Sequence, residues 1–152
     1  MRAFLFNACK AVRRPNFVRM VKRFGFSKRE RLKSRKQIDT LFAEGKPLSA
    51  FPIRAVYRFI PATEKPGLLV GVTASKKYYK LAVDRNRVKR LLREAYRLQK
   101  EDLWQQVKQA NVSGRIFFIY TDKTIADFET MKTAMGKCLQ RLSKNLSHEN
   151  HP

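Results

Sequence analysis

Apolar residues recur along the chain at spacings that predict helices in some stretches and strands in others. Ile38, Leu41 and Phe42 lie three and four residues apart, which predicts a short helix that ends at Gly45. Residues 51–60 alternate between apolar and polar positions, which predicts a strand with one buried face. The first part of the predicted domain therefore begins with a helix and continues into a sheet.

Two further stretches predict strands that are more completely buried. Residues 68–74 are almost continuously apolar and predict a central strand, and residues 115–120 predict a strand buried on both faces. Apolar residues from Phe128 to Leu146 recur at helical spacing, which predicts a last helix packed on the sheet, with Cys138 as a small buried residue. The predicted fold is a single-domain α/β sandwich of order α-β-β-β-α-β-α.

The segment between these two strands predicts one long helix, from about Asp84, which stands at the N-cap position, to about Val107. Its apolar residues fall on one side, and cations fill the adjoining side. Lys89, Arg93 and Arg97 are four residues apart and therefore line one ridge. A single glutamate interrupts the run of cations, whereas solvated helix faces usually mix both signs of charge. This helix is predicted to hold a polyanion against a folded domain.

The composition supports an anionic partner. The chain of 152 residues contains 34 Lys and Arg but only 12 Asp and Glu, which gives a formal net charge of +22 at pH 7. Such an excess favours strong, salt-dependent binding of nucleic acid, and an anionic membrane surface is the other candidate. No run of about 20 apolar residues predicts a membrane span.

Residue types needed for protein-based catalysis or metal binding are sparse. Cys9 and Cys138 lie far apart, without partners at metal-ligand spacing, which indicates a reducing compartment and no zinc site. The only histidines, His148 and His151, lie in the polar tail formed by residues 147–152, so histidine-based catalysis is not expected. The sequence contains no phosphate-binding glycine motif. It therefore predicts a binding protein with no catalytic residue and no metal site of its own.

Residues 1–25 form a basic extension without a single acid, and residues 26–146 form the predicted domain. A secretory signal is not expected, because the apolar run at residues 4–6 is too short. Three interpretations stay open: an additional basic arm, an organellar transit peptide, and a start site placed too far upstream. The last, with Met20 as the true start, is slightly favoured; the absence of serine speaks against a transit peptide.

Two further basic clusters, at residues 28–33 and 76–80, lie near aromatic residues. Cations contact phosphates while aromatic faces stack on unpaired bases, a combination used to bind single-stranded RNA. Tyr57 on its strand and Phe42 on the short helix are predicted to form such a platform, with Phe42 also expected to pack in the core.

Three motifs, in this order and at this spacing, resemble the protein subunit of bacterial ribonuclease P. They are Arg31-Leu32-Lys33 with the following short helix that ends Leu41-Phe42-Ala43-Glu44-Gly45, the stretch Val70-Gly71-Val72-Thr73-Ala74-Ser75-Lys76-Lys77, and the helix that opens Asp84-Arg85-Asn86-Arg87. The similarity covers about residues 26–145, and the joint match is far more specific than Arg-Asn-Arg alone.

The resemblance implies the family's sandwich with a left-handed βαβ crossover, although general rules favour the right-handed form. It also implies the function of a ribonuclease P subunit: assisting an endoribonuclease that removes the 5′ leader of precursor tRNA with the help of Mg²⁺. In that family the catalytic RNA, the partner of the protein, holds most of the Mg²⁺ and carries the catalysis. A bacterial cytoplasmic location follows, and organellar targeting by residues 1–25 is less expected.

Site residues follow from the resemblance position by position. The helix residues implied to contact the catalytic RNA and the region near the cleavage site are Arg85, Asn86, Arg87, Lys89, Arg90 and Arg93. The basic clusters add Arg97, Lys76, Lys77, Lys28, Arg29 and Arg31 to the predicted RNA-binding residues. A cleft for the single-stranded leader is implied to be lined by Ile38, Phe42, Tyr57, Lys89 and Arg93. Ile38 departs from the family, where an aromatic residue is usual, so it is expected to make only apolar contact.

Three alternatives compete with this interpretation. A non-enzymatic RNA-binding module, such as a ribosome-associated protein, explains the charge equally well. A DNA-binding protein would place the helix over residues 85–97 in the major groove, but this helix has an apolar stripe and no turn-helix partner before it. A membrane-surface protein would act through residues 1–25. Neither DNA nor a membrane is the predicted partner.

Overall fold

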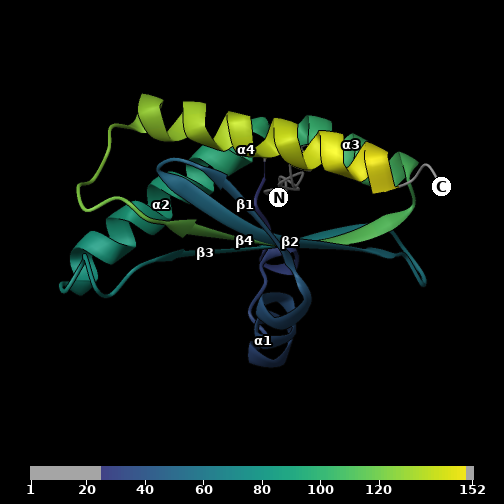
Figure 1. Ribbon diagram of the computed structural model, residues 1–152, viewed down its shortest axis with the longest axis horizontal. Coiled ribbons are helices and arrows are strands. Elements are labelled where there is room, and N and C mark those ends of the chain that lie inside the picture. The colour runs from purple at the N-terminus through teal and green to yellow at the C-terminus, as the bar shows by residue number, and fades with distance from the viewer. Residues whose placement is uncertain (1–24, 150–152) are drawn as a thin grey trace, which may run out of the picture.

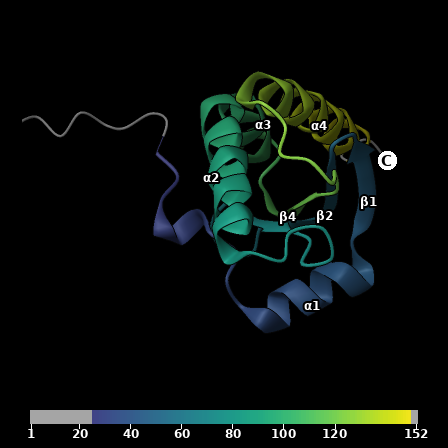
Figure 2. The same cartoon turned by 90° about the vertical axis from the view of Figure 1, so that its left-hand side faces the viewer.

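The computed structural model describes residues 25–149, which form a four-stranded sheet with helices on both faces (Figures 1 and 2). The elements are, in chain order, a 3-10 turn at Lys28–Glu30, α1 (Arg35–Glu44), β1 (Lys46–Ala50), β2 (Ile53–Pro61), β3 (Gly67–Ala74), α2 (Ala82–Gln99), α3 (Glu101–Gln109), β4 (Val112–Tyr120) and α4 (Phe128–Glu149). The predicted α/β sandwich is confirmed. None of the described helices is both long and apolar enough to cross a bilayer.

The strands lie in the order β1-β2-β4-β3. β2 is antiparallel to both of its neighbours, whereas β3 and β4 are parallel and are connected through α2 and α3. The prediction that residues 68–74 form a central strand is wrong, because β3 is the last strand of the sheet. Its outer edge is partly covered by the upstream chain, since the Leu32 N–H donates to the Val70 carbonyl at 3.0 Å. That cover explains why an outer strand is so apolar.

Two helical boundaries and one strand differ from the prediction. β1 had been given no position, and Pro47 within it is tolerated because β1 lies at the edge of the sheet. The long helix begins at Ala82, so Asp84 lies in its first turn and not at the N-cap. It is also interrupted at Lys100, which separates α2 from α3. The interruption lets α2 pack on β3 and α4, while α3 packs on α4 and on the ends of β3 and β4.

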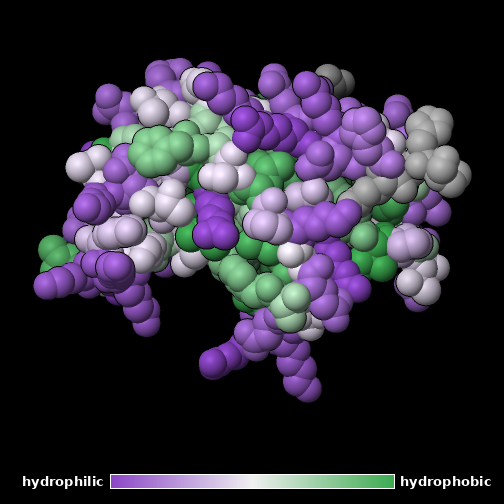
Figure 3. Space-filling view, viewed as in Figure 1, coloured by the Kyte–Doolittle hydropathy of each residue, from purple (hydrophilic) through white to green (hydrophobic). Residues whose placement is uncertain are grey.

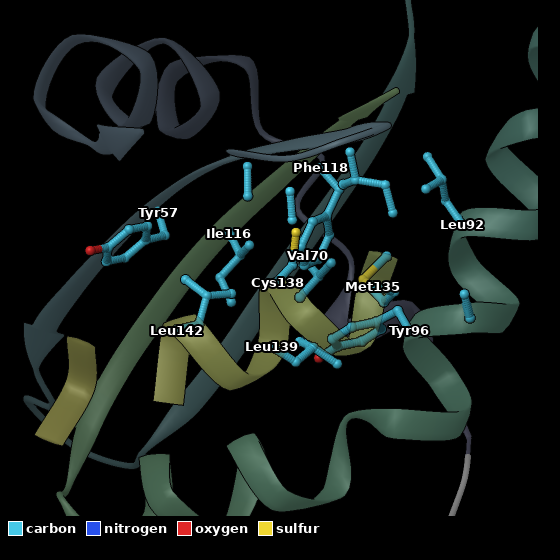
Figure 4. Packing of buried hydrophobic residues seen from close by; sticks show 14 of the residues in the cluster. Tyr57, Val70, Leu92, Tyr96, Ile116, Phe118, Met135, Cys138, Leu139 and Leu142 are labelled. Carbon is cyan, nitrogen blue, oxygen red and sulfur yellow. The ribbon is translucent and has the colours of Figure 1, made fainter. Parts of the chain in front are cut away.

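The sheet face toward α2, α3 and α4 carries the main core, and we call it the closed face. Ile116, Phe118 and Tyr120 of β4 are fully buried there. Figure 4 shows Met135 and Cys138 of α4 in the same cluster. Cys138 is the small buried residue that its helical spacing predicted, and burial raises the pKa of its thiol to about 11.

The opposite face of the sheet is only partly covered, and we call it the open face. α1 lies on this side, across the sheet from α2 to α4 (Figure 2). A small cluster packs here: Leu32, Leu41 and Val56 are buried, and Ile38, Leu69 and Phe117 are half-buried. Side chains of β4 alternate between buried and half-buried along its length, so the prediction that this strand is buried on both faces is wrong.

Candidate nucleic-acid interface

A hollow of about 340 Å³ lies on the open face, and we call it the sheet hollow. Val72 and Phe117 come from the strands of its floor, and Ile38 lines it from α1. Arg93 lines it from α2, and Arg31 lines it from the chain before α1. Two of the five predicted cleft residues, Ile38 and Arg93, are therefore brought together. An apolar floor with a cationic rim suits an unpaired nucleotide strand.

Gly71 and Phe117 shape the floor of the sheet hollow. A Cβ added at Gly71 would lie 2.3 Å from the Phe117 ring, so the ring occupies the space that any other residue would fill. Phe42, which is 46% exposed, packs edge-on against Phe117 with 5.3 Å between the ring centroids. Phe117 was not among the predicted cleft residues, although strict alternation along β4 would have separated it from the buried Phe118.

Tyr57 does not belong to this hollow, and the prediction that it lines the cleft is wrong. Its side chain is 4% exposed and lies in the core of the closed face, as Figure 4 shows. The Tyr57 hydroxyl accepts a hydrogen bond from Asn145 Nδ2 of α4 at 2.8 Å. Neighbouring strand residues point to opposite faces, so an error of one position moves a side chain through the sheet. The neighbour of Tyr57 in β2, Val56, lies on the open face and packs in the cluster beneath α1.

The surroundings of Arg93, one of the predicted RNA-binding residues, disfavour its positive charge. Burial lowers the pKa of its guanidinium, and the nearby positive charges of Arg31 and Arg90 lower it further. The group nevertheless remains a cation, because an arginine pKa starts far above neutrality. Cations held close together and partly removed from water create a potential that attracts anions.

The other predicted RNA-binding residues surround the hollows or lie beyond them. Arg85 donates to the backbone carbonyls of Tyr79 and Lys80 at 2.7 and 2.6 Å, so its guanidinium holds the β3–α2 loop. Lys89 is half-buried one helical turn before Arg93 and lines neither hollow described here. The predicted residues that are exposed are Asn86, Arg87, Arg90, Lys76, Lys77, Lys28, Arg29 and Arg31. Hydrophilic side chains project at the β3–α2 loop and at α1 (Figure 3).

A buried lysine fixes the chain segment that completes the interface. Lys100 is 7% exposed, and its Nζ lies 2.5 Å from Glu30 Oε2. This pair holds the segment before α1 against α2, where Phe26 packs edge-on against Tyr96 with 5.5 Å between centroids. The Arg31 guanidinium lies 5.3 Å from the centroid of the Phe26 ring. Lys100 was not among the predicted site residues, because nothing in the local sequence distinguishes it from the many other lysines.

The described residues supply binding groups in place of an acid–base constellation. Within residues 25–149, no group of three or more His, Cys, Asp or Glu side chains is placed to hold a metal ion. The one histidine in that range, His148, lies near the end of α4. The interface thus consists of guanidinium and ammonium groups, apolar surface and aromatic rings.

Residues 1–25 were predicted as a separate extension, and all of them except Gly25 lie outside the described residues, as does the end of the polar tail at residues 150–152. The interpretations of the extension, including a start at Met20, therefore stay predictions.

Comparison with known proteins agrees with the motifs and with the fold. The family model for Ribonuclease P matches residues 26–143. The ribonuclease P protein component of Porphyromonas gingivalis is 41% identical over 123 residues, which covers 81% of this chain and 90% of that protein. The solved RNase P protein from Thermotoga maritima has a TM-score of 0.56 and 24% identity, covering 74% of this chain and 96% of that one. The Staphylococcus aureus RNase P protein has a TM-score of 0.56 and 18% identity, covering 76% and 95%. The two solved structures support the fold, and the family match with the P. gingivalis relative shows that this chain belongs to the ribonuclease P protein family.

Proposed function

We propose that this chain binds the catalytic RNA of ribonuclease P and the 5′ leader of precursor tRNA, and so assists endonucleolytic removal of the leader. The observation that carries the proposal is the sheet hollow, where the apolar floor at Phe117 is bordered by Arg93 and Arg31. The leader is single-stranded, and mature tRNA lacks it. Contacts in the hollow therefore favour binding of the substrate over binding of the product.

Different surfaces suit the two RNA partners. The sheet hollow presents half-buried apolar groups, which suit unpaired bases, with Phe42 at its margin. The first turns of α2 expose polar groups at Asn86 and Arg87, which suit the backbone of a folded RNA. We assign the leader to the first surface and the catalytic RNA to the second.

The net charge explains how a protein can assist a reaction that it does not catalyse. Precursor tRNA is a polyanion that approaches a polyanionic RNA, and a protein with a formal charge of +22 reduces their repulsion. Mg²⁺ in this proposal supplies charge neutralisation and Lewis-acid activation of water at the cleavage site. We assign it mainly to the RNA, since the described protein residues form no cluster of acidic ligands.

Reconstitution tests this proposal. The purified chain, a ribonuclease P RNA and precursor tRNA are combined at low Mg²⁺, and release of the leader is followed over time. The chain should stimulate formation of a tRNA with a mature 5′ phosphate end. Arg93→Gln should reduce the stimulation, whereas Arg141→Gln, which removes the same charge from α4 on the closed face, should not. No stimulation by the unaltered chain would favour a non-enzymatic RNA-binding module.

A further inference from the structure

A second hollow, of about 320 Å³, adjoins the sheet hollow on the side of α2, and we call it the arginine hollow. Its lining residues are Phe26, Arg31, Arg90, Arg93, Glu94 and Arg97. Phe26, Arg31 and Arg93 also line the sheet hollow, so these three side chains form the ridge between the two. An RNA strand bound in one hollow would pass over this ridge into the other hollow.

Three of the four arginines that line the arginine hollow form no ion pair with an acid among residues 25–149. Within residues 25–149, no carboxylate forms an ion pair with Arg31, Arg90 or Arg93. Burial lowers the pKa of Arg93, and the positive charges of Arg31 and Arg90, which line the same hollow, lower it further. An anion placed among them would relieve this repulsion.

Glu94 and Arg97, which both line the hollow, form an ion pair. Arg97 Nε donates to Glu94 Oε2 at 2.9 Å, and its terminal nitrogen donates to Oε1 at 2.5 Å. This two-point contact fixes the plane of the guanidinium and leaves a carboxylate in the lining of the hollow. A second anion entering the hollow competes with Glu94 for Arg97.

The lining also decides which part of a nucleotide fits. The Phe26 ring has the Arg31 guanidinium 5.3 Å from its centroid and packs edge-on with Tyr96, which limits the ring surface on which a base could stack. Guanidinium groups present only hydrogen-bond donors. A phosphate, with its anionic acceptor oxygens, matches this donor set better than a base does.

We propose that the arginine hollow is a second RNA subsite, which binds a backbone phosphate of the same single strand whose unpaired nucleotide occupies the sheet hollow. The inference rests on the proposed function, because it takes the sheet hollow as a site for single-stranded RNA. Arg97 strengthens binding in the arginine hollow. Glu94 weakens it, because its carboxylate repels the phosphate and occupies Arg97.

The test is a titration of the full chain with a labelled single-stranded oligouridine about ten nucleotides long, a length within the range that single-strand sites span. Binding is followed by fluorescence anisotropy at several KCl concentrations. Arg97→Gln should weaken binding about threefold and make the dependence of log K on log salt shallower by about 0.7, the slope of one phosphate contact in a single strand. Glu94→Gln should tighten binding about threefold, which is an increase that a merely structural role would not produce.

Arg141→Gln provides the matched control, since it also removes one charge. Arg141 bonds to the Ser49 carbonyl of β1, at the opposite edge of the sheet from β3. Three strand spacings, or roughly 14 Å, exceed the screening length of about 8 Å at physiological salt. The control should change neither affinity nor slope. If Arg97→Gln behaves like this control, or if Glu94→Gln fails to tighten binding, the subsite is overturned.

Two further measurements keep the inference separate from the proposed function. If Arg97→Gln shows no thermal unfolding transition, Arg90→Gln is used in its place. Arg90→Gln should make the dependence of log K on log salt shallower by the same amount. Unchanged affinity and slope in Arg90→Gln, as in the Arg141→Gln control, would overturn the subsite. Reconstituted cleavage is measured in parallel with the unaltered chain. Stimulated cleavage with unchanged oligouridine binding in the variants overturns the subsite alone. The expected binding changes without stimulated cleavage support the subsite and overturn the proposed function.

Discussion

Phe117 and Phe118 are neighbours in β4, yet they lie in two different environments. Phe118 is fully buried on the closed face, beneath helices that cover the sheet from one edge to the other. Phe117 is half-buried on the open face, where only α1 and the segment before it provide cover. The same side chain thus serves stability on one face and provides a binding surface on the other. One face of the sheet therefore contributes stability, and the opposite face provides a binding surface.

Replacing each phenylalanine in turn should separate the two faces most strongly. Phe118→Ala should lower the free energy of unfolding by about 3–5 kcal/mol, the usual cost of emptying a fully buried aromatic site. Phe117→Ala should cost only about 1–2 kcal/mol, because its side chain is only half-buried in the folded protein. Urea unfolding measures both, and oligouridine binding should show the reverse order, with the larger loss for Phe117→Ala. Equal stability losses would contradict the distinction between the faces.

The buried Lys100–Glu30 pair provides the second test, because it attaches the wall of the open face to α2. Lys100→Met leaves the Glu30 carboxylate without its partner, and this carboxylate is 31% exposed. The loss should therefore be about 1–3 kcal/mol, below the cost of breaking a fully buried pair. RNA affinity should also fall, since both hollows share that wall.

A surface ion pair supplies the control for Lys100→Met. Lys132 and Glu129 are 3.9 Å apart and largely exposed, so Lys132→Met should change stability by less than about 0.5 kcal/mol. Equal losses in the two variants would show that the Lys100–Glu30 pair has no special role.

Gly71 in β3 and Gly114 in β4 allow the open and closed faces to be compared by glycine-to-alanine substitution. Gly71→Ala forces the Phe117 ring to move and should cost about 1–2 kcal/mol while weakening oligouridine binding. On the closed face, a Cβ at Gly114 would lie 2.7 Å from Leu68 Cδ1, so Gly114→Ala should cost a similar amount. Binding should be unchanged in Gly114→Ala. A binding loss of the same size in both variants would mean that the floor of the sheet hollow does not contact RNA.

The smallest effect is expected at Tyr57. Tyr57→Phe removes the hydrogen bond from Asn145 and should lower the free energy of unfolding by about 1 kcal/mol. Its oligouridine affinity should be unchanged, because the hydroxyl lies on the closed face. A clear loss of RNA affinity in Tyr57→Phe would contradict the placement of Tyr57 outside the RNA-binding site.

Periodicity predicted those parts of the fold that depend on one element at a time. The stripe predicted on α2 comprised Val88, Leu91, Leu92, Ala95 and Leu98. Val88, Leu92 and Ala95 are buried and Leu91 is half-buried, whereas Leu98 is 37% exposed. The stripe on α4 was equally clear, since Met131, Met135 and Leu142 are buried at helical spacing. Apolar continuity alone did not distinguish an outer strand from a central one, because the chain before α1 covers the edge of β3.

The candidate site depended on contacts that no local pattern records. Arg93 and Ile38 were predicted and do meet in the sheet hollow. Tyr57 was misplaced because similarity of motifs located the strand but not the face of each residue on it. The Lys100–Glu30 pair joins residues 70 positions apart, so neither residue alone indicated the contact. Phe117 could have been found from alternation in β4.

The most direct test of the central claim compares precursor tRNA with and without its leader. Arg93→Ala is assembled with the catalytic RNA, and the affinity for both ligands is measured at fixed salt. If the open face binds the leader, the affinity for leader-bearing tRNA should fall about tenfold, the value of one hydrogen bond to a charged group, while the affinity for leaderless tRNA changes little. Equal losses for the two ligands would contradict a leader site on the open face.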